Sequence, residues 1–325
     1  MPLAGGAVRA IRLLLLCLLM GLSGLAQAEC TLSRTNAVFG QVSSFAVNAS
    51  AQNTSAGLQL DCDTVLNLLT SDFVRVTYAG ASSSSGTRAV LRNTTSSDQS
   101  TIPVMLCAVA GCGSELNISG IYTWSGNTLL GLLTSKRYSL PLYLRTVPGQ
   151  SVSAGTWQTT LSLNVNWSIC SLGVAVCLAA QTGSSTVSIT VTLVVTNDCS
   201  TLTTPVLDFG SAALVSGFSD VRQTISITCT KGSVYTVGIN NGNYASGGAR
   251  NLANGSSRLR YEIYKGTGND RWGVSGNERW PSGASTSQSS DGLLRTYAYT
   301  ARILSGQATP PPGNYSDTLV VDVAF

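Results

Sequence analysis

The sequence has 325 residues, of which 43% are hydrophobic and only 10% are charged, and its formal net charge at pH 7 is +4. So weak a charge balance argues against electrostatic steering toward nucleic acid. The chain contains no histidine, which excludes Ser-His-Asp and Cys-His nucleophile systems and imidazole metal sites.

The N-terminus has the form of a secretory signal. Arg9 and Arg12 precede an apolar run, Leu13–Leu22, and the small-residue cleavage site Ala26-Gln27-Ala28 follows. Residues 1–28 are therefore predicted to be a cleaved signal peptide, whose two arginines lower the net charge from +4 to +2 when they are removed. A membrane anchor is the alternative interpretation, but the apolar run is too short to span a bilayer.

The cysteines predict a disulfide framework. Removal of the signal also removes Cys17 and leaves eight cysteines, an even number that in an exported chain indicates disulfides. Cys30 and Cys199 are each followed about ten residues later by a Phe-Gly pair, Phe39-Gly40 and Phe209-Gly210, and each has another cysteine about thirty residues later. Zinc is the competing interpretation, but the spacings fit no zinc module. The expected pairs are Cys30–Cys62 and Cys199–Cys229 from this repeat, and Cys107–Cys112 and Cys170–Cys177 by elimination and proximity.

The body of the mature chain is poor in charge, rich in Ser, Thr, Gly and Asn, and strand-like throughout. Short apolar or alternating runs are separated by turn signals that contain Gly or Asn, and no long amphipathic helix is evident. Strands in units of roughly 130 residues predict two β-sandwiches in tandem. The predicted strands include 73–78, 102–107, 138–146, 187–195, 224–230, 234–240, 259–264 and 297–304.

A repeated segment closes both predicted units. Residues 154–167, AGTWQTTLSLNVNW, align without a gap to residues 312–325, PGNYSDTLVVDVAF, and both carry apolar residues at every second position, as a half-buried strand requires. Thirty-one residues separate Trp167 from Cys199, whereas the sequence stops at Phe325. This asymmetry is the basis of the functional hypothesis.

The second unit resembles the spore coat protein U domain family, whose fold is that of the subunits of archaic, Csu-type chaperone-usher pili. The matching features span nearly all of residues 199–325, whereas the first unit resembles the family only at its ends and at points such as Arg88 and Leu91. The matching residues are Cys229, Gly242, Arg250, Leu252, Gly255, Tyr261, Tyr264, Trp272, Gly273, Gln307, Gly313, Tyr315, Asp317 and Thr318.

The resemblance implies an all-β chain of two tandem immunoglobulin-like β-sandwich domains, the second lacking its final strand. An apolar groove would then stay open, to be filled first by a periplasmic chaperone and later, after passage through an outer-membrane usher, by a strand from an adjacent pilin subunit. Strand addition to an exposed edge supplies main-chain hydrogen bonds and pockets for alternate side chains.

The segment 186–196, TVSITVTLVVT, stands just before Cys199, where an ordinary pilin of this family keeps its donor extension. Because it is attached to the preceding domain, we expect it to complete that domain in cis, with the donor residues Val187, Ile189, Val191, Leu193 and Val195. The alternative is an ordinary edge strand or linker. The expected domains are residues 29–196, an adhesin-like domain closed by 186–196, and residues 197–325, a spore coat U-type pilin domain.

We expect the second domain to accept a strand from another protein, and the mature chain to have none to donate, because signal cleavage leaves only Glu29 ahead of Cys30. A subunit that accepts without donating belongs at the tip of a fibre, so the expected localisation is extracellular, after export through the periplasm.

Three apolar loop stretches of the first domain are candidates for a binding surface. Apolar residues on short loops with glycine, two of which are bracketed by cysteines, are unusual for solvent-facing turns and indicate interaction sites. The alternative is that these side chains pack into the core. The candidates are Ala108, Val109 and Ala110; Leu129, Leu130, Leu132 and Leu133; and Leu172, Val174 and Val176.

The sequence therefore predicts a non-enzymatic pilus tip adhesin that binds a hydrophobic or host surface and supports biofilm formation, without cofactor or metal. The alternatives are a structural fimbrial or coat subunit and a carbohydrate-binding tip adhesin. Carboxylates such as Glu262 and Glu278 show no spacing that favours a glycosidase pair. The loop containing Arg271, Trp272 and Trp280 could bind sugar, but a structural role is favoured because Trp272-Gly273 matches the family.

Overall fold

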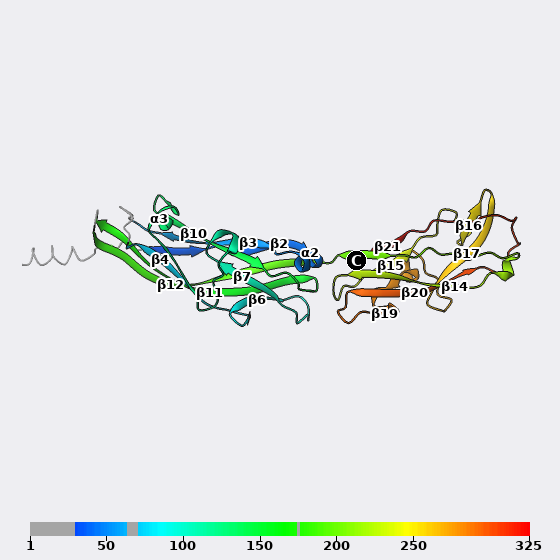
Figure 1. The fold of residues 1–325 in the computed structure, drawn as a ribbon, viewed down its shortest axis with the longest axis horizontal. Coiled ribbons are helices and arrows are strands. Elements are labelled where there is room, and N and C mark those ends of the chain that lie inside the picture. The colour runs from blue at the N-terminus through cyan, green and yellow to red at the C-terminus, as the bar shows by residue number, and fades with distance from the viewer. Residues whose placement is uncertain (1–29, 64–70, 174–175) are drawn as a thin grey trace, which may run out of the picture.

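The computed structural model describes residues 30–63, 71–173 and 176–325. The expected signal peptide and Val174 lie outside these ranges. The described residues form two β-sandwich units in a row, one from Cys30 to Thr196 and one from Cys199 onward (Figure 1). Each unit has its own hydrophobic core. The helical elements are α2 (Ser44–Ala49), α3 (Gly126–Leu130) and the 3-10 turns η1 (Ala110–Cys112), η2 (Val215–Gly217), η3 (Gly276–Glu278) and η4 (Ser282–Ala284).

The first unit has two layers of strands. One layer has the order β1-β3-β10-β7-β6 and the other β2-β12-β11-β4-β8, and the layers are joined where β11 also pairs with β6. The first layer consists of β1 (Thr31–Arg34), β3 (Asn53–Asp61), β10 (Arg137–Thr146), β7 (Ile102–Cys107) and β6 (Arg88–Asn93), with the short strands β5 (Ser84–Ser85) and β9 (Leu133–Thr134). The second consists of β2 (Ala37–Ser43), β12 (Cys177–Thr196), β11 (Gly155–Gly173), β4 (Phe73–Ala81) and β8 (Ile121–Ser125).

Strand β12 lies between β11 and β2. It pairs antiparallel with β11 along its whole length, so that Ile189 faces Leu161, and it pairs parallel with β2, where Val191 faces Ala37. Alternation places its apolar side chains on the core face and mostly hydroxyl side chains on the solvent face, as a period of two requires. The core-facing residues are Val187, Ile189, Val191, Leu193 and Val195, and all five are buried.

The second unit has the same plan with a narrower second layer. Its first layer has the order β13-β14-β20-β17-β16, and its second layer contains only β18-β15-β21. The strands are β13 (Cys199–Thr203), β14 (Val221–Cys229), β20 (Leu294–Ile303), β17 (Ser257–Lys265), β16 (Arg250–Asn254), β19 (Ser287–Gln288) beside β20, β18 (Trp280–Pro281), β15 (Thr236–Ile239) and β21 (Val321–Ala324).

The described residues contain four disulfides, and they are the four pairs expected from the sequence. Cys30–Cys62 and Cys199–Cys229 occupy equivalent places in the two units, where each joins the start of the unit to the strand β3 or β14 that pairs with its first strand. Cys107–Cys112 closes a short turn after β7. Cys170–Cys177 joins β11 to β12 near the turn of their hairpin.

The two units contact each other at a polar junction. The hydroxyl groups of Ser44 and Thr230 lie 2.8 Å apart in a buried hydrogen bond. The Lys231 ammonium donates to Asp98 Oδ1 at 3.0 Å and to Ser100 Oγ at 2.8 Å. Only two residues separate the end of β12 from the start of β13. The units are therefore held together by side-chain contacts as well as by this short connection.

Candidate functional site

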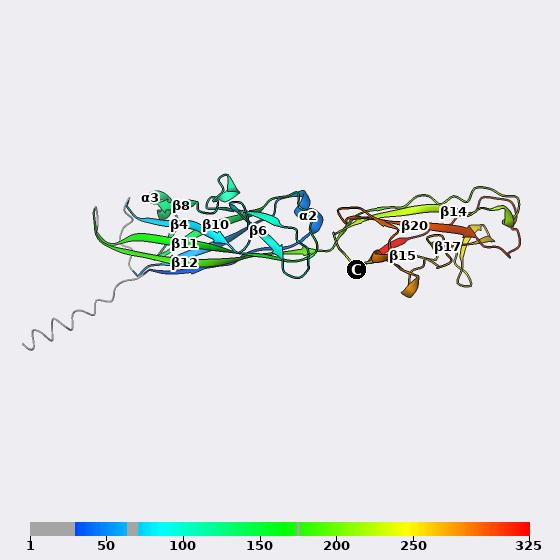
Figure 2. The same cartoon turned by 90° about the horizontal axis from the view of Figure 1, so that it is seen from below.

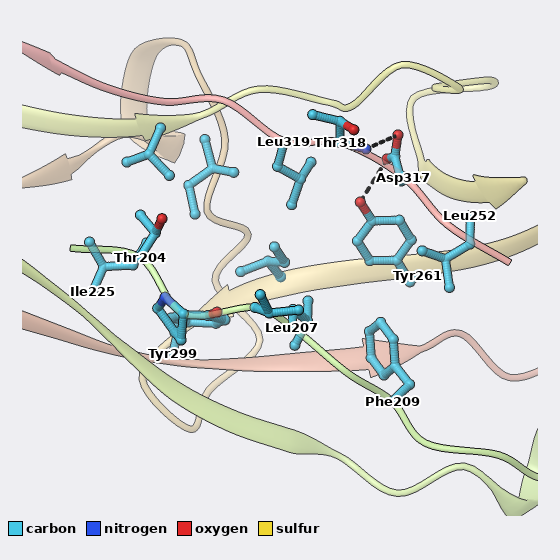
Figure 3. A pocket seen from close by; sticks show the side chains of 15 residues that line it. Thr204, Leu207, Phe209, Ile225, Leu252, Tyr261, Tyr299, Asp317, Thr318 and Leu319 are labelled. Carbon is cyan, nitrogen blue, oxygen red and sulfur yellow. Dashed lines mark hydrogen bonds between the residues drawn. The ribbon is translucent and has the colours of Figure 1, made fainter. Parts of the chain in front are cut away.

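An apolar groove opens along the second unit. One wall is the segment 204–209, and the other is the segment 317–321 that leads into β21 (Figure 3). The floor comes from the facing layer, where Ile225, Tyr261 and Tyr299 point into the groove. The groove has a volume of about 280 Å³, and a second hollow of about 440 Å³ continues it toward residues 313–316.

The groove lies where the first unit has β12. In the repeat, Leu161, Leu163 and Val165 of β11 correspond to Leu319, Val321 and Val323. The three residues of the first unit are at most 1% exposed, whereas their counterparts are only half-buried. Strand β21 pairs with β15, and no described strand pairs with its other edge. An unpaired edge beside an incompletely covered apolar row has the geometry that accepts an added strand.

Asp317 is the polar group in the middle of the groove, and both hollows contact it. Its carboxylate accepts hydrogen bonds from the Tyr261 hydroxyl at 2.8 Å and from the backbone N–H groups of Asn243 and Thr318, each at 2.8 Å. Burial, and then the hydrogen bond to Asp317, raise the pKa of Tyr261 well above its usual range. Tyr261 therefore remains a neutral donor that holds this carboxylate in place.

A buried ion-pair network supports the end of β15. The Arg250 guanidinium is fully buried, pairs with Glu262, and donates to the backbone carbonyls of Ile239 and Trp272. Burial lowers the pKa of Arg250, and the Glu262 carboxylate opposes this shift. Because one partner carbonyl belongs to β15, the network keeps the partner strand of β21 in position. The favoured structural role of the Trp272 loop agrees with the complete burial of Trp272.

The second candidate region is the far end of the first unit. There the β11–β12 hairpin projects beyond the neighbouring strands, because the pairing of β11 with β4 ends at Ser168 and β11 continues to Gly173 (Figure 1). Three apolar side chains near its turn are exposed, with Leu172 at 53%, Val176 at 71% and Leu178 at 76%. Side chains of this size are rarely so exposed together, and such groups mark interaction sites.

The structure corrects two of the proposed binding residues. Ala108 is only 6% exposed because it follows directly on the buried Cys107, and Leu129 is fully buried. Leu129 belongs to α3, a single helical turn that packs against β8 and β4, so one of its leucines faces the core while its neighbour Leu130 is exposed.

The remaining candidates are divided between two places. Leu132 and Leu133, after α3, are half-buried against the core. Val109 and Ala110 are exposed, but their turn lies beside the middle of the unit, because Cys107 pairs with Tyr143 on β10. Tyr143 lies about 20 Å along β10 from the outer end of that strand. The Cys107–Cys112 turn is therefore not part of the far end, whereas α3, which ends at Leu130, lies near the hairpin end in Figure 1.

Sequence reasoning left two sets of residues out of the candidate site. Leu178 was outside the chosen stretch, although an apolar residue directly after Cys177 was a usable signal. The groove residues were not named because they come from strands far apart in the sequence. Those that line both hollows are Val206, Leu207, Phe209, Leu252 and Asp317.

A metal site, a catalytic carboxylate pair and a membrane-spanning helix are further features to consider in the described residues. Within them, no three His, Cys, Asp or Glu side chains lie close enough to hold a metal ion together. Glu262 and Glu278 both bind Arg271, at 2.8 and 2.6 Å, so they form ion pairs rather than a free carboxylate pair. None of the helices in the described ranges has the length and hydropathy of a membrane span.

These features define a class of protein with two tandem immunoglobulin-like β-sandwiches, one closed and one with an open groove. The chain matches the Spore Coat Protein U domain over residues 18–164 and again over residues 185–322, and it belongs to that family. No curated protein sequence matches it.

The solved structures that are similar to this chain include two tip subunits. One is the CsuC–CsuE chaperone–tip adhesion subunit pre-assembly complex from archaic chaperone-usher Csu pili of Acinetobacter baumannii; the match is 22% identical, covers 91% of this chain and 100% of that chain, and has a TM-score of 0.56. The other is the CupB6 tip adhesin from Pseudomonas aeruginosa, at 11% identity, 91% and 95% coverage and a TM-score of 0.37. The first shows that the fold is shared.

Proposed function

We propose that this protein is a non-enzymatic adhesin at the tip of an archaic chaperone-usher pilus, where it supports attachment to surfaces and biofilm formation. The observation that carries the proposal is the contrast between the two units: β12 fills the first unit at the position where the second unit has an open groove. The family and the similarity to a Csu tip subunit support it.

The open groove is the joint to the rest of the fibre. A partner strand with apolar side chains at alternate positions would pair with the free edge of β21 and cover Leu319, Val321 and Val323. We infer that a periplasmic chaperone supplies this strand before assembly at the outer-membrane usher, and that the adjacent pilin subunit supplies it afterwards.

The closed first unit is the contact domain, and β12 is its donor strand in cis. The chain thereby covers the apolar row of the first unit with its own residues, and that unit needs no partner strand. A closed unit can project outward, which leaves the hairpin residues Leu172, Val176 and Leu178 free for a surface.

The hairpin suits an apolar, water-repellent surface. Burial of three aliphatic side chains, at roughly 1.5–3 kcal/mol each, gives useful adhesion, and many pili per cell multiply it. The Cys170–Cys177 bridge limits the conformational freedom of the turn, so little entropy is lost on contact.

The proposal is tested with pilus-bearing cells that carry Leu172→Ser, Val176→Ser and Leu178→Ser together. Attachment to polystyrene should fall at least tenfold, while the amount of secreted protein stays the same and gold-labelled antibody stays at fibre ends. Val109→Ser is the matched control, since Val109 is 49% exposed but lies away from the hairpin.

Three outcomes oppose the proposal. Unchanged attachment of the triple variant would show that the hairpin is not part of the contact surface. Antibody label along the whole fibre indicates a structural shaft subunit instead. Inhibition by free sugars, with no response to the triple variant, indicates a carbohydrate-binding tip adhesin.

A further inference from the structure

The longest strand of the protein connects the two candidate sites. Strand β12 has 20 residues and runs from the outer hairpin to the junction between the units (Figure 2). At about 3.3 Å per residue it spans about 65 Å. Its first residue, Cys177, directly follows the exposed Val176, and its last, Thr196, lies at the junction.

The same backbone continues into the groove wall. After Asn197 and Asp198 the chain forms β13, and residues 204–209 then line the groove. The Cys199–Cys229 disulfide fastens the chain to β14 where it enters the second unit. One segment, residues 177–209, therefore leads from the hairpin to the groove.

No other described segment reaches from the far end to the groove without reversing direction. From Leu130 the chain passes through β9, β10 and β11 before it enters β12, and the pairings of β9 with β10 and of β11 with β12 are antiparallel. A force applied at Leu130 would have to cross hydrogen bonds between chain segments to reach the groove segment 204–209.

We propose that residues 177–209 form the tension element of the protein, which passes a pulling force from the hairpin to the groove through covalent backbone. This rests on the proposed function, in which the hairpin holds the surface and the groove holds the fibre. An extended strand pulled at both ends is already near its maximal length of about 3.3–3.6 Å per residue. The pairings of β12 with β11 and β2 then lie beside the path of the force, so tension does not unzip the first unit.

The junction keeps this path straight. Thr230 and Lys231, which directly follow β14, bind Ser44, Asp98 and Ser100 of the first unit, on both sides of the connection. Ser153 and Lys231 also form a parallel β-bridge across the junction. These contacts resist bending at Asn197 and Asp198, where the backbone is not part of a strand.

The test is single-molecule force spectroscopy on the full mature chain with azide-bearing residues as handles. One variant is pulled between positions 176 and 206, and the other between positions 130 and 206. All three native side chains are exposed, Val176 at 71%, Val206 at 87% and Leu130 at 54%, so the handles disturb no core. Circular dichroism and disulfide content verify that both variants are folded.

Pulling at 176 and 206 should give no lengthening step above about 20 Å before a handle detaches, because the segment is already extended. Pulling at 130 and 206 should give a step on the order of 150 Å as the first unit unfolds. In a matched pair that also carries Cys170→Ser and Cys177→Ser, this step should grow by about 20 Å, while the 176–206 trace stays unchanged.

A step of similar size in both variants would overturn the proposal, because β12 would then not carry the force by itself. Absence of any step for the 130–206 variant would also overturn it, since the two attachment points would be equivalent. If attachment to polystyrene does not depend on the hairpin, the proposed function fails, but these traces still decide which backbone carries tension.

Discussion

The two sandwich units are built on one plan and differ in one strand. In the first unit the second layer has the order β2-β12-β11-β4-β8, whereas in the second it stops at β18-β15-β21. The segment around Phe209 that corresponds to β2 forms no strand, because its pairing partner β12 has no described equivalent. A single missing strand therefore leaves two others incompletely paired, which shows how much of a sandwich depends on its last strand.

The comparison also shows that the same residues can be core or binding surface. The row Leu161, Leu163 and Val165 is core, while Leu319, Val321 and Val323, with the same spacing, line or adjoin a groove. Only the presence of a covering strand separates the two states.

The largest effect is expected from Leu193→Asp in β12. Leu193 is fully buried, and the loss of its apolar burial together with an unpaired carboxyl group should cost an amount comparable to the roughly 5–15 kcal/mol that stabilise a domain. The first unit should lose protection in amide hydrogen exchange while peptides of the second unit keep it. Ser188→Asp, on the exposed face of the same strand, is the control and should change little. Normal protection of the first unit in the Leu193 variant would show that β12 is dispensable.

The two disulfides that occupy equivalent places in the two units should contribute equally to stability. Their loss should nevertheless have unequal consequences for folding. Replacing Cys30 and Cys62 with alanine, or Cys199 and Cys229, removes a bridge over 32 or 30 residues. Each loss should cost about 3–4 kcal/mol on the chain-entropy model. Denaturant titration should show a folded first unit in the former variant and an unfolded second unit in the latter, because the open unit begins with less stability. Equal tolerance of both losses would contradict the difference between the units.

An added strand should stabilise only the open unit. A peptide with the sequence of residues 186–196 should stabilise the second unit by about 2.7 kcal/mol at one hundred times its Kd, and so raise the melting temperature of that unit. The first unit should not respond, because its slot is filled by the same sequence. A peptide with serine in place of its five core-facing residues is the control. A higher melting temperature of both units, or of neither, would argue against a groove that accepts a strand.

The smallest effect is expected at the junction. Burial raises the pKa of Asp98, but hydrogen bonds from Ser100, Ser153 and Lys231 outweigh it, so the pKa of Asp98 lies well below its usual range. A depressed carboxyl pKa contributes stability above the unfolded-state value near 3.9, and this is lost only as pH falls through the folded value. The contribution of the Asp98 contacts to stability should therefore be constant between pH 5 and pH 8.

Lys231→Met should cost about 0.2–1 kcal/mol, since the Lys231 side chain is partly exposed. Calorimetry of the two unfolding transitions measures this loss, and it should be the same at pH 5 and pH 8. Lys231→Arg is the control that keeps the charge. A cost that disappears between pH 8 and pH 5 would contradict the assigned protonation of Asp98.

Much of the architecture could be predicted from the sequence. The alternation in residues 186–196 indicated a half-buried strand, and the repeated Cys and Phe-Gly spacing indicated the two long disulfides. These predictions rest on local periodicity and on an internal repeat, both of which are visible in one dimension. The loops were predicted less well, because an apolar loop residue has no period to show which way it faces. Leu129 and Leu130 are adjacent, yet one is buried and the other exposed.

The linear order of the residues establishes a disulfide-bonded, all-β chain of two related units, because alternation, cysteine spacing and the repeat can all be recognised without the fold. Which apolar residues are exposed is set by the folded arrangement. Burial depends on partners that arrive from distant segments, so the groove between residues 204–209 and 317–321 exists only after folding. For the same reason, the Cys107–Cys112 turn lies beside the middle of the first unit, whereas the β11–β12 hairpin projects beyond the strands next to it.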